Sequence, residues 1–541
     1  MADKVFVKVN EGRIRGFKKI SSFSHVEYCC FLGVPYAQST EEHNRFKDPV
    51  KIKPWNGVLD ATQEKEGCRQ FAITLKCITG SEDCLYNNIY TTKLPTNGEP
   101  LKPVIVNIHP GGFIFGSPDP SRYGSPEFIM HHDIVYVTIG YRIHILGFLN
   151  LGLKECSGNQ GLKDIIMSLE WIKKNIHSFG GDPNNITVMG SSSGSAIVHF
   201  LMLSPRAKGL FHKAIMMGMH VLNPTLLTQR ENVTSAFEIA KFLGYEGTSE
   251  NRRKLLSFLK TVDIDTVILM KLESVYRNVQ IPIFPASPFV PTQDQGNNAI
   301  VPLSPEELVP STARIPLMVG FCDKEAAMVF TNEKYKNMLV NNLYSIVTQN
   351  PWGWGRNLAD DDIKLIKKKS ESFYLNGEST GKANMSDKCD IMTDIALSDV
   401  YSSLIDIVSD DHSPVYVYKF NYEGSVPKVK DAVVLQLDGP LEGTVHADDY
   451  CYWSLVKDYK NKNDYLITPK SSEMIETFTK LICTFAETGD PNYGKLNIRW
   501  EPSTVENPCY LRIDEKFELI DGKLNGKRMQ FWENLKKEFA N

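Results

Sequence analysis

A Gly-x-Ser-x-Gly segment at residues 190–194 constrains the fold of this chain more than any other feature. It follows a β-branched run, 186–188, and precedes an apolar run, 196–203, that is compatible with a helix. In this strand–turn–helix context the glycines permit a turn that is too tight for side chains. We therefore expect Ser192 to stand clear of a sheet at a helix N-terminus, where negative charge is favoured and a serine can act as a nucleophile.

A second glycine-rich segment offers the hydrogen-bond donors that a nucleophilic serine needs for its oxyanion. Residues 104–108 are expected to form a buried strand, and residues 109–113 follow it directly. The backbone N–H groups of Gly111 and Gly112, together with that of Ser193, are the candidate donors. Glycines after a strand are also typical of an ordinary turn, so it is the pairing with Ser192 that favours an oxyanion hole.

The general base is sought among the histidines that follow in the chain order serine, acid, histidine. His412 and His446 are the two that follow every plausible acid position. His412 precedes a strand-like run, 415–420, whereas His446 follows it. Active sites of open α/β sheets lie at the carboxyl ends of the strands. His446 is therefore the candidate base, and His412 is interpreted as a solvated loop residue.

The acid should follow a strand that lies between Ser192 and His446. Residues 315–321 have the character of such a strand, and the next residues are Cys-Asp-Lys-Glu. Asp323 and Glu325 both satisfy the spacing, and either carboxylate could instead be one that a helix dipole favours. The residue types alone do not separate the two.

Beyond these residues, much of the chain resembles the type-B carboxylesterases. This is the carboxylesterase/cholinesterase family of the α/β-hydrolase fold, and the most similar branch is the intracellular α-esterases of insects. Residues 179–194 match the serine signature of the family. Further matching stretches are 31–37, 81–86, 140–142, 146–148, 158–164 and 485–492.

The resemblance implies a complete set of catalytic residues. The family's acid motif falls on residues 324–326 and its histidine motif on 443–449, which implies Glu325 as the acid and His446 as the base. With Ser192 as nucleophile and Gly111, Gly112 and Ser193 as oxyanion donors, the implied enzyme is a serine carboxylic-ester hydrolase that acts through an acyl-enzyme. Uncharged carboxyl esters are its expected substrates, among them xenobiotic and insecticide esters.

Three departures from the family pattern lie close to these residues. Ser191 stands where the family has Glu, Ala326 replaces a Gly, and Pro110, which has no N–H, replaces another Gly. Ser191 and Pro110 leave open an alternative function in the same family, a protein that is acylated, turns over slowly and sequesters esters or organophosphates. A cholinesterase fits less well because residues 69–83 contain no tryptophan, and an adhesion-type relative fits less well because the triad is complete.

The composition limits the partners. The chain has 60 Lys and Arg against 64 Asp and Glu, a net charge of −4, so nucleic acid is not an expected partner. No apolar run is long enough to span a bilayer. Neither a metal nor a cofactor is expected, because the chain lacks His-Glu-x-x-His, a paired Cys-x-x-Cys and a phosphate-binding loop. A small-molecule ester remains as the expected partner, and the oligomeric state is left open.

The expected architecture is one α/β domain over residues 1–541, with a mostly parallel central sheet covered by helices on both faces. Helical insertions near 222–285 and 330–405 would wall a deep gorge, as the resemblance suggests. The N-terminus has no hydrophobic signal region, from which we expect a cytoplasmic protein. Of the eleven cysteines, Cys68 and Cys84 would pair if the chain follows its secreted relatives.

Overall fold

The structure is a computed structural model of the 541-residue chain. It describes residues 3–539 apart from 73–75, 97, 121–122, 224–231, 271–287, 332–357, 398–399, 401–403, 410–412, 427–428, 435–436, 438–439 and 456–466.

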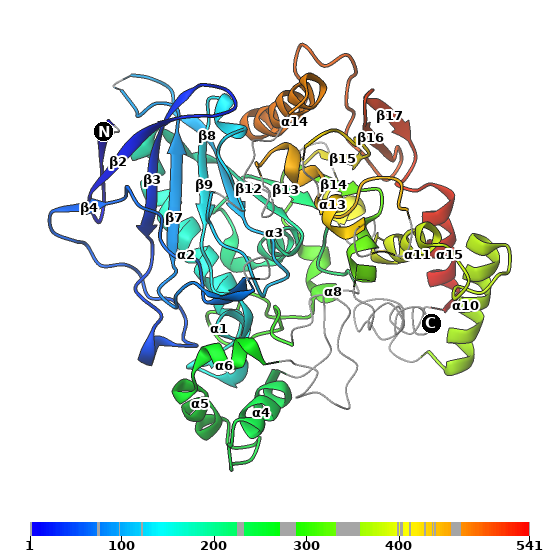
Figure 1. The fold of residues 1–541 in the computed structure, drawn as a ribbon, viewed down its shortest axis with the longest axis horizontal. Coiled ribbons are helices and arrows are strands. Elements are labelled where there is room, and N and C mark those ends of the chain that lie inside the picture. Colours follow the sequence, from blue (N-terminus) through cyan, green and yellow to red (C-terminus); the bar gives the residue numbers. More distant parts are fainter. Residues whose placement is uncertain are drawn as a thin grey trace.

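A large central sheet organises the molecule (Figure 1). In the described part of the chain it has 13 strands in the order β1-β2-β3-β7-β9-β8-β12-β13-β14-β15-β16-β17, with β4 beside β2. All neighbours from β9 to β16 pair in parallel, whereas both margins of the sheet are mainly antiparallel. The strands are β1 Lys4–Val9, β2 Gly12–Ile20, β3 Glu27–Pro35, β4 Val58–Asp60, β7 Tyr86–Thr91, β8 Lys102–Ile108, β9 Val135–Ile139, β12 Gly181–Ser191, β13 Lys213–Met217, β14 Leu317–Cys322, β15 Val415–Phe420, β16 Cys509–Ile513 and β17 Glu518–Asp521.

The strands expected from the sequence are present in this sheet. The runs 104–108 and 415–420 form the last part of β8 and the whole of β15. The run 315–321 forms β14, which begins at Leu317 because the preceding Pro316 has no N–H to donate to a ladder. Its six residues are all buried, as parallel strands require when helices cover both faces.

Two hydrophobic clusters lie on opposite faces of the sheet, because successive side chains of a strand point to opposite sides. On β8, Val104 and Val106 belong to the first cluster and Ile105 to the second. Helices α2 (Gln160–Asn175) and α3 (Ser193–Leu203) pack in the first, and α14 (Pro469–Thr488) packs in the second. A mostly parallel sheet with helices on both faces is the expected α/β-hydrolase architecture.

Parts of both expected helical insertions are described. The first contains α4 (Asn232–Phe242), α5 (Arg252–Thr261) and α6 (Ile264–Leu269), and the second contains α10 (Asp360–Leu375) and α11 (Met385–Leu397). Residues 271–287 and 332–357 lie outside the described residues, so the gorge and the single domain stay predictions. The other α-helices in the described part of the chain are α1 His144–Phe148, α8 Pro305–Leu308, α12 Asp406–Val408, α13 Val429–Val434 and α15 Lys527–Phe539.

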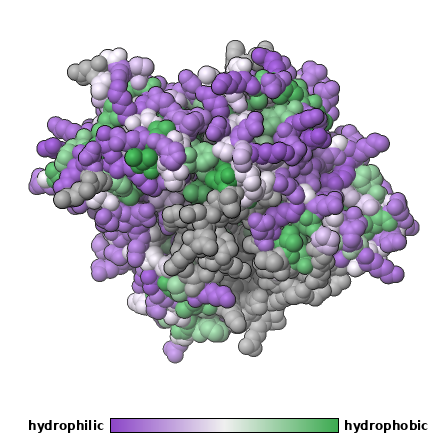
Figure 2. Space-filling model, turned by 45° about the horizontal axis from the view of Figure 1, so that its top comes forward, coloured by the Kyte–Doolittle hydropathy of each residue, from purple (hydrophilic) through white to green (hydrophobic). Residues whose placement is uncertain are grey.

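The surface in Figure 2 is mostly hydrophilic, with hydrophobic side chains in small separate areas. Within the described ranges, no helix combines the length and the apolar character that a membrane crossing requires.

Candidate active site

The candidate nucleophile occupies a strained turn. Strand β12 ends at Ser191 and α3 begins at Ser193, while Ser192 between them has φ 54° and ψ −128°, a backbone conformation that residues with side chains rarely adopt. A Cβ on Gly190 would lie 2.4 Å from the carbonyl of Gly194, and one on Gly194 would lie 2.3 Å from the Ile108 oxygen. Glycines on both sides of Ser192 are therefore required by close backbone contacts, as the motif predicts.

The candidate base and acid form a buried pair. The Nδ1 of His446 lies 2.5 Å from Oε2 of Glu325, and both residues are buried. Glu325 Oε1 accepts a second hydrogen bond, from the N–H of Cys322 at 2.6 Å. The N–H of Lys324 donates to Thr444 O at 2.8 Å, which joins the loop after β14 to the segment that carries His446.

Burial favours the neutral form of His446, but Glu325 opposes it through its charge and its hydrogen bond. With the charges of Asp449 and Asp448 added, the pKa of His446 is raised above its ordinary value of 6.5. A carboxylate in this position also fixes the tautomer, because it holds the proton on Nδ1 and leaves Nε2 as the acceptor.

The structure separates the two candidate acids. Asp323 forms an ion pair with Lys419, Oδ1 to Nζ, at 2.6 Å. Its other oxygen lies against Gly443, where an added Cβ would come within 2.3 Å. Although burial opposes the charge, Lys419 lowers the pKa of Asp323. Glu325 is the acid that reaches the imidazole, and the alternative base, His412, lies outside the described residues.

Gly218, directly after β13, connects the serine to this pair. The N–H of Ser192 donates to Met217 O at 2.8 Å. A Cβ on the next residue, Gly218, would lie 3.0 Å from Nδ1 and Cε1 of His446 and 3.2 Å from Oε2 of Glu325. The serine turn and the His446–Glu325 pair thus both contact the end of β13, which lies between β12 and β14 in the sheet (Figure 1).

The predicted oxyanion donors lie beside the serine turn. Gly111 and Gly112 have φ 132° and 59°, which suit glycine. Within the described part of the chain, no acceptor bonds to their N–H groups or to that of Ser193. A Cβ on Gly194 would contact both Ile108 O and His109 O, so the start of α3 packs directly on the end of β8. The three N–H groups therefore belong to two segments that pack on each other, and among the described residues they have no acceptor.

A histidine and a tyrosine support the start of the glycine segment. The ring of His109 stacks on Tyr141 with centroids 4.2 Å apart, and the Tyr141 hydroxyl donates to His109 O at 3.0 Å. The His109 Nδ1 lies 2.9 Å from Pro110 O. Burial lowers the pKa of His109 to about 4, which keeps this ring neutral, so it supports the loop and adds no charge to the site.

Asp449 lies near the site and was not singled out from the sequence. Burial and the charge of Glu325 raise the pKa of Asp449 to about 6, although the Tyr418 hydroxyl donates to its Oδ2 at 2.7 Å. The signal that could have identified Asp449 is its position three residues after His446 in the shared motif.

Cys68 and Cys84 form a disulfide with Cα atoms 4.9 Å apart, which confirms the pairing that the resemblance implied.

The arrangement is suited to acyl transfer. It combines a hydroxyl on a strained turn, an imidazole oriented by a carboxylate and unpaired backbone N–H groups close by.

Known proteins are similar to this chain in sequence and in fold over most of their length. The profile of the Carboxylesterase family matches residues 3–532. Esterase FE4 of Myzus persicae is 31% identical over 519 residues, which cover 93% of this chain and 88% of that protein. The juvenile hormone esterase of Tribolium castaneum is 30% identical over 508 residues, covering 90% and 84% respectively. The crystal structure of juvenile hormone esterase from Manduca sexta, with OTFP covalently attached, has a TM-score of 0.82 and 27% identity, and covers 99% of this chain and 100% of that chain.

Proposed function

Because the chain belongs to the carboxylesterase family and is a serine hydrolase of carboxylic esters, we propose that Ser192, His446 and Glu325 carry out its reaction. His446 Nε2 accepts the proton of the Ser192 hydroxyl while the oxygen attacks the ester carbonyl carbon. The tetrahedral intermediate expels the alcohol, which takes the proton from His446, and an acyl-enzyme remains. Water then attacks the acyl carbon, again with His446 as the base, and the carboxylic acid leaves as Ser192 regains its proton.

The oxyanion of both tetrahedral intermediates is bound by the N–H groups of Gly111, Gly112 and Ser193. Each donor of this kind is worth about 10²–10³-fold in kcat. Pro110 adds no donor, but three remain without it. Glu325 stabilises the imidazolium that forms on proton transfer. The observation that carries the proposal is the 2.5 Å contact between His446 and Glu325 directly beside the strained Ser192 turn.

Uncharged esters are the substrate class that we propose. The segment enclosed by the Cys68–Cys84 disulfide contains no tryptophan on which a quaternary ammonium could stack. The similar proteins include juvenile hormone esterases and Esterase FE4. Turnover of xenobiotic and insecticide esters is proposed as the physiological role, and the cytoplasmic location stays a prediction.

The test of the nucleophile combines turnover with adduct mapping. A dialkyl phosphate inhibitor should add its phosphoryl mass to the peptide that contains Ser192. Ser192→Ala should lower hydrolysis of p-nitrophenyl esters about 10⁴-fold or more, because triad residues act as a unit. Ser195→Ala is the matched control, since the Ser195 hydroxyl is buried on α3, three residues after Ser192, and donates to Met219 O at 2.6 Å; it should keep most of the turnover. An adduct on another serine would refute the assignment.

The same assay decides between turnover and sequestration. Continued release of p-nitrophenol over many equivalents per site is expected for a hydrolase. One equivalent per site followed by no further release would identify the slow, sequestering alternative that Ser191 and Pro110 suggest.

A further inference from the structure

We propose that Gln70 is a positioning residue for the oxyanion loop, defined as residues 109–116. The proposal rests on the function given above, and Gln70 acts through the loop rather than on the substrate. It lies on the short strand β5 (Gln70–Ala72), which pairs with β6 (Cys77–Thr79) inside the segment that the Cys68–Cys84 disulfide closes.

The side-chain amide of Gln70 pairs with both backbone groups of Gly116. Oε1 accepts from the N–H of Gly116 at 2.8 Å, and Nε2 donates to the Gly116 carbonyl at 2.8 Å. Nε2 also donates to Cys68 O at 2.9 Å, which ties the amide to the disulfide. The side chain is buried, so losing it would leave both backbone groups of Gly116 without these partners.

Gly116 in turn packs on the start of the oxyanion loop. It has φ 114°, and a Cβ there would lie 2.3 Å from Nδ1 of His109 and 2.4 Å from Pro110 O. Within the loop, the Gly111 carbonyl accepts from the N–H groups of Ile114 and Phe115 at 3.0 Å each, which links the residues just before Gly116 to Gly111. A displacement of Gly116 therefore reaches Gly111, one of the proposed donors.

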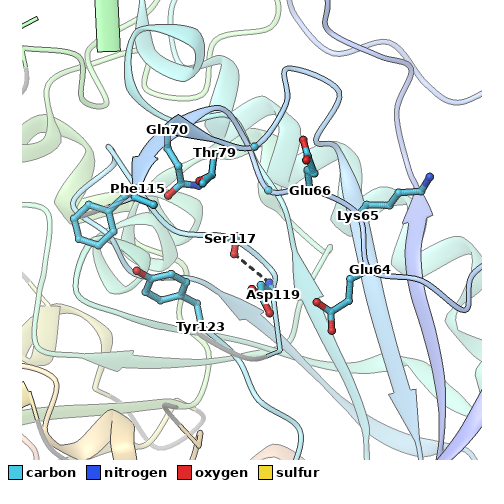
Figure 3. Close-up of a pocket in the computed structure, with 12 residues that line it drawn as sticks. Glu64, Lys65, Glu66, Gln70, Thr79, Phe115, Ser117, Asp119 and Tyr123 are labelled. Atoms are coloured by element: carbon cyan, nitrogen blue, oxygen red, sulfur yellow. Dashed lines mark hydrogen bonds between the residues drawn. The ribbon is translucent and has the colours of Figure 1, made fainter. Parts of the chain in front are cut away.

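A cavity borders this side of the loop. A cavity of about 210 Å³ is bordered by Gln70, Phe115 and Ser117, and Figure 3 shows these side chains around it. Because the cavity leaves room for movement, the two hydrogen bonds from Gln70 restrain Gly116 on this side. Oxyanion donors act only when they are fixed in place before the reaction, and a misplacement of 1 Å can cost about 10²-fold in rate.

The experiment compares Gln70→Ala and Gln70→Met with Gln160→Ala in the full-length enzyme. Methionine keeps the volume of glutamine but not its hydrogen bonds, and it serves if the alanine variant does not fold. Gln160 is the matched control, because it is buried and its Nε2 also donates to two backbone carbonyls, those of Phe46 at 2.9 Å and Leu149 at 3.0 Å. The readouts are kcat per titrated active site, KM, affinity for a trifluoromethyl ketone and amide exchange in residues 109–116.

Both Gln70 variants should lower kcat about 10- to 100-fold with little change in KM, because the donors act mainly in the transition state. Affinity for the ketone should fall by a similar factor, and amide exchange in the loop should rise. Gln160→Ala should leave all of these unchanged while it lowers the melting temperature. Folded Gln70 variants with unaltered kcat and ketone affinity, or with unaltered exchange, would overturn the proposal. If the wild-type enzyme hydrolysed no ester, the proposed function would fail, whereas the exchange data would still decide whether Gln70 holds the loop.

Discussion

At the scale of single residues, the protonation of His446 sets the pH dependence of ester hydrolysis. The reaction needs its neutral form, so activity is lost as pH falls through its pKa. Burial works against protonation, but Glu325 and Asp449 outweigh it and raise that pKa above 6.5. The acid limb of kcat/KM for an uncharged ester should therefore lie above pH 6.5. Asp449→Asn removes one of the negative charges, and the limb should move to lower pH.

Asp323→Asn is the control for this shift. Asp323 is a partly buried carboxylate close in sequence to Glu325, and its charge is balanced by Lys419. Its replacement should leave the acid limb in place. A wild-type limb below pH 6, or a limb that Asp449→Asn does not move, would show that the charges around His446 do not control its protonation.

At the scale of elements, a buried ion pair joins the segment after β9 to α2. The Nε and Nη2 atoms of Arg142 lie 2.8 and 2.6 Å from the Asp164 carboxylate, and both side chains are inaccessible to solvent. Breaking such a pair leaves an uncompensated buried charge. Arg142→Leu should therefore cost about 3–5 kcal/mol of stability, measured as a lower urea midpoint.

Lys470→Gln, on α14, is the comparison for Arg142→Leu. Lys470 also forms an ion pair, with Glu515 at 3.1 Å, but its side chain is 76% exposed. Exposed pairs contribute little, so the midpoint should not change measurably. Equal effects of the two substitutions would mean that Arg142 contributes only a surface-type interaction.

At the scale of the whole molecule, the near-balanced charge bears on the choice of substrate. A net charge of −4 over 541 residues gives no strong field for steering cations. We expect 3,3-dimethylbutyl acetate, the uncharged isostere of acetylcholine, to have the higher kcat/KM of the two. Its kcat/KM should also change little as ionic strength rises to ~0.5 M. A clear preference for acetylcholine that declines with salt would contradict the uncharged substrate class.

The sequence by itself determined the features that local chemistry dictates. The tight turn around Ser192 requires the glycines at 190 and 194, and the mostly apolar run 415–420 forms a strand that is buried except at Lys419. The order serine, acid, histidine and the end of the strand that His446 follows were likewise readable, because parallel strands present their carboxyl ends at one edge.

The tertiary structure decided what depends on direction in space. Asp323 and Glu325 are two residues apart with the same charge, and only the path of the chain turns one toward Lys419 and the other toward His446. The contact of Gln70 with Gly116 joins residues 46 positions apart, and no local preference of a glutamine indicates such a partner. The pKa values of His446 and Asp449 are also tertiary properties, since burial and neighbouring charges exist only once the strands and loops have come together.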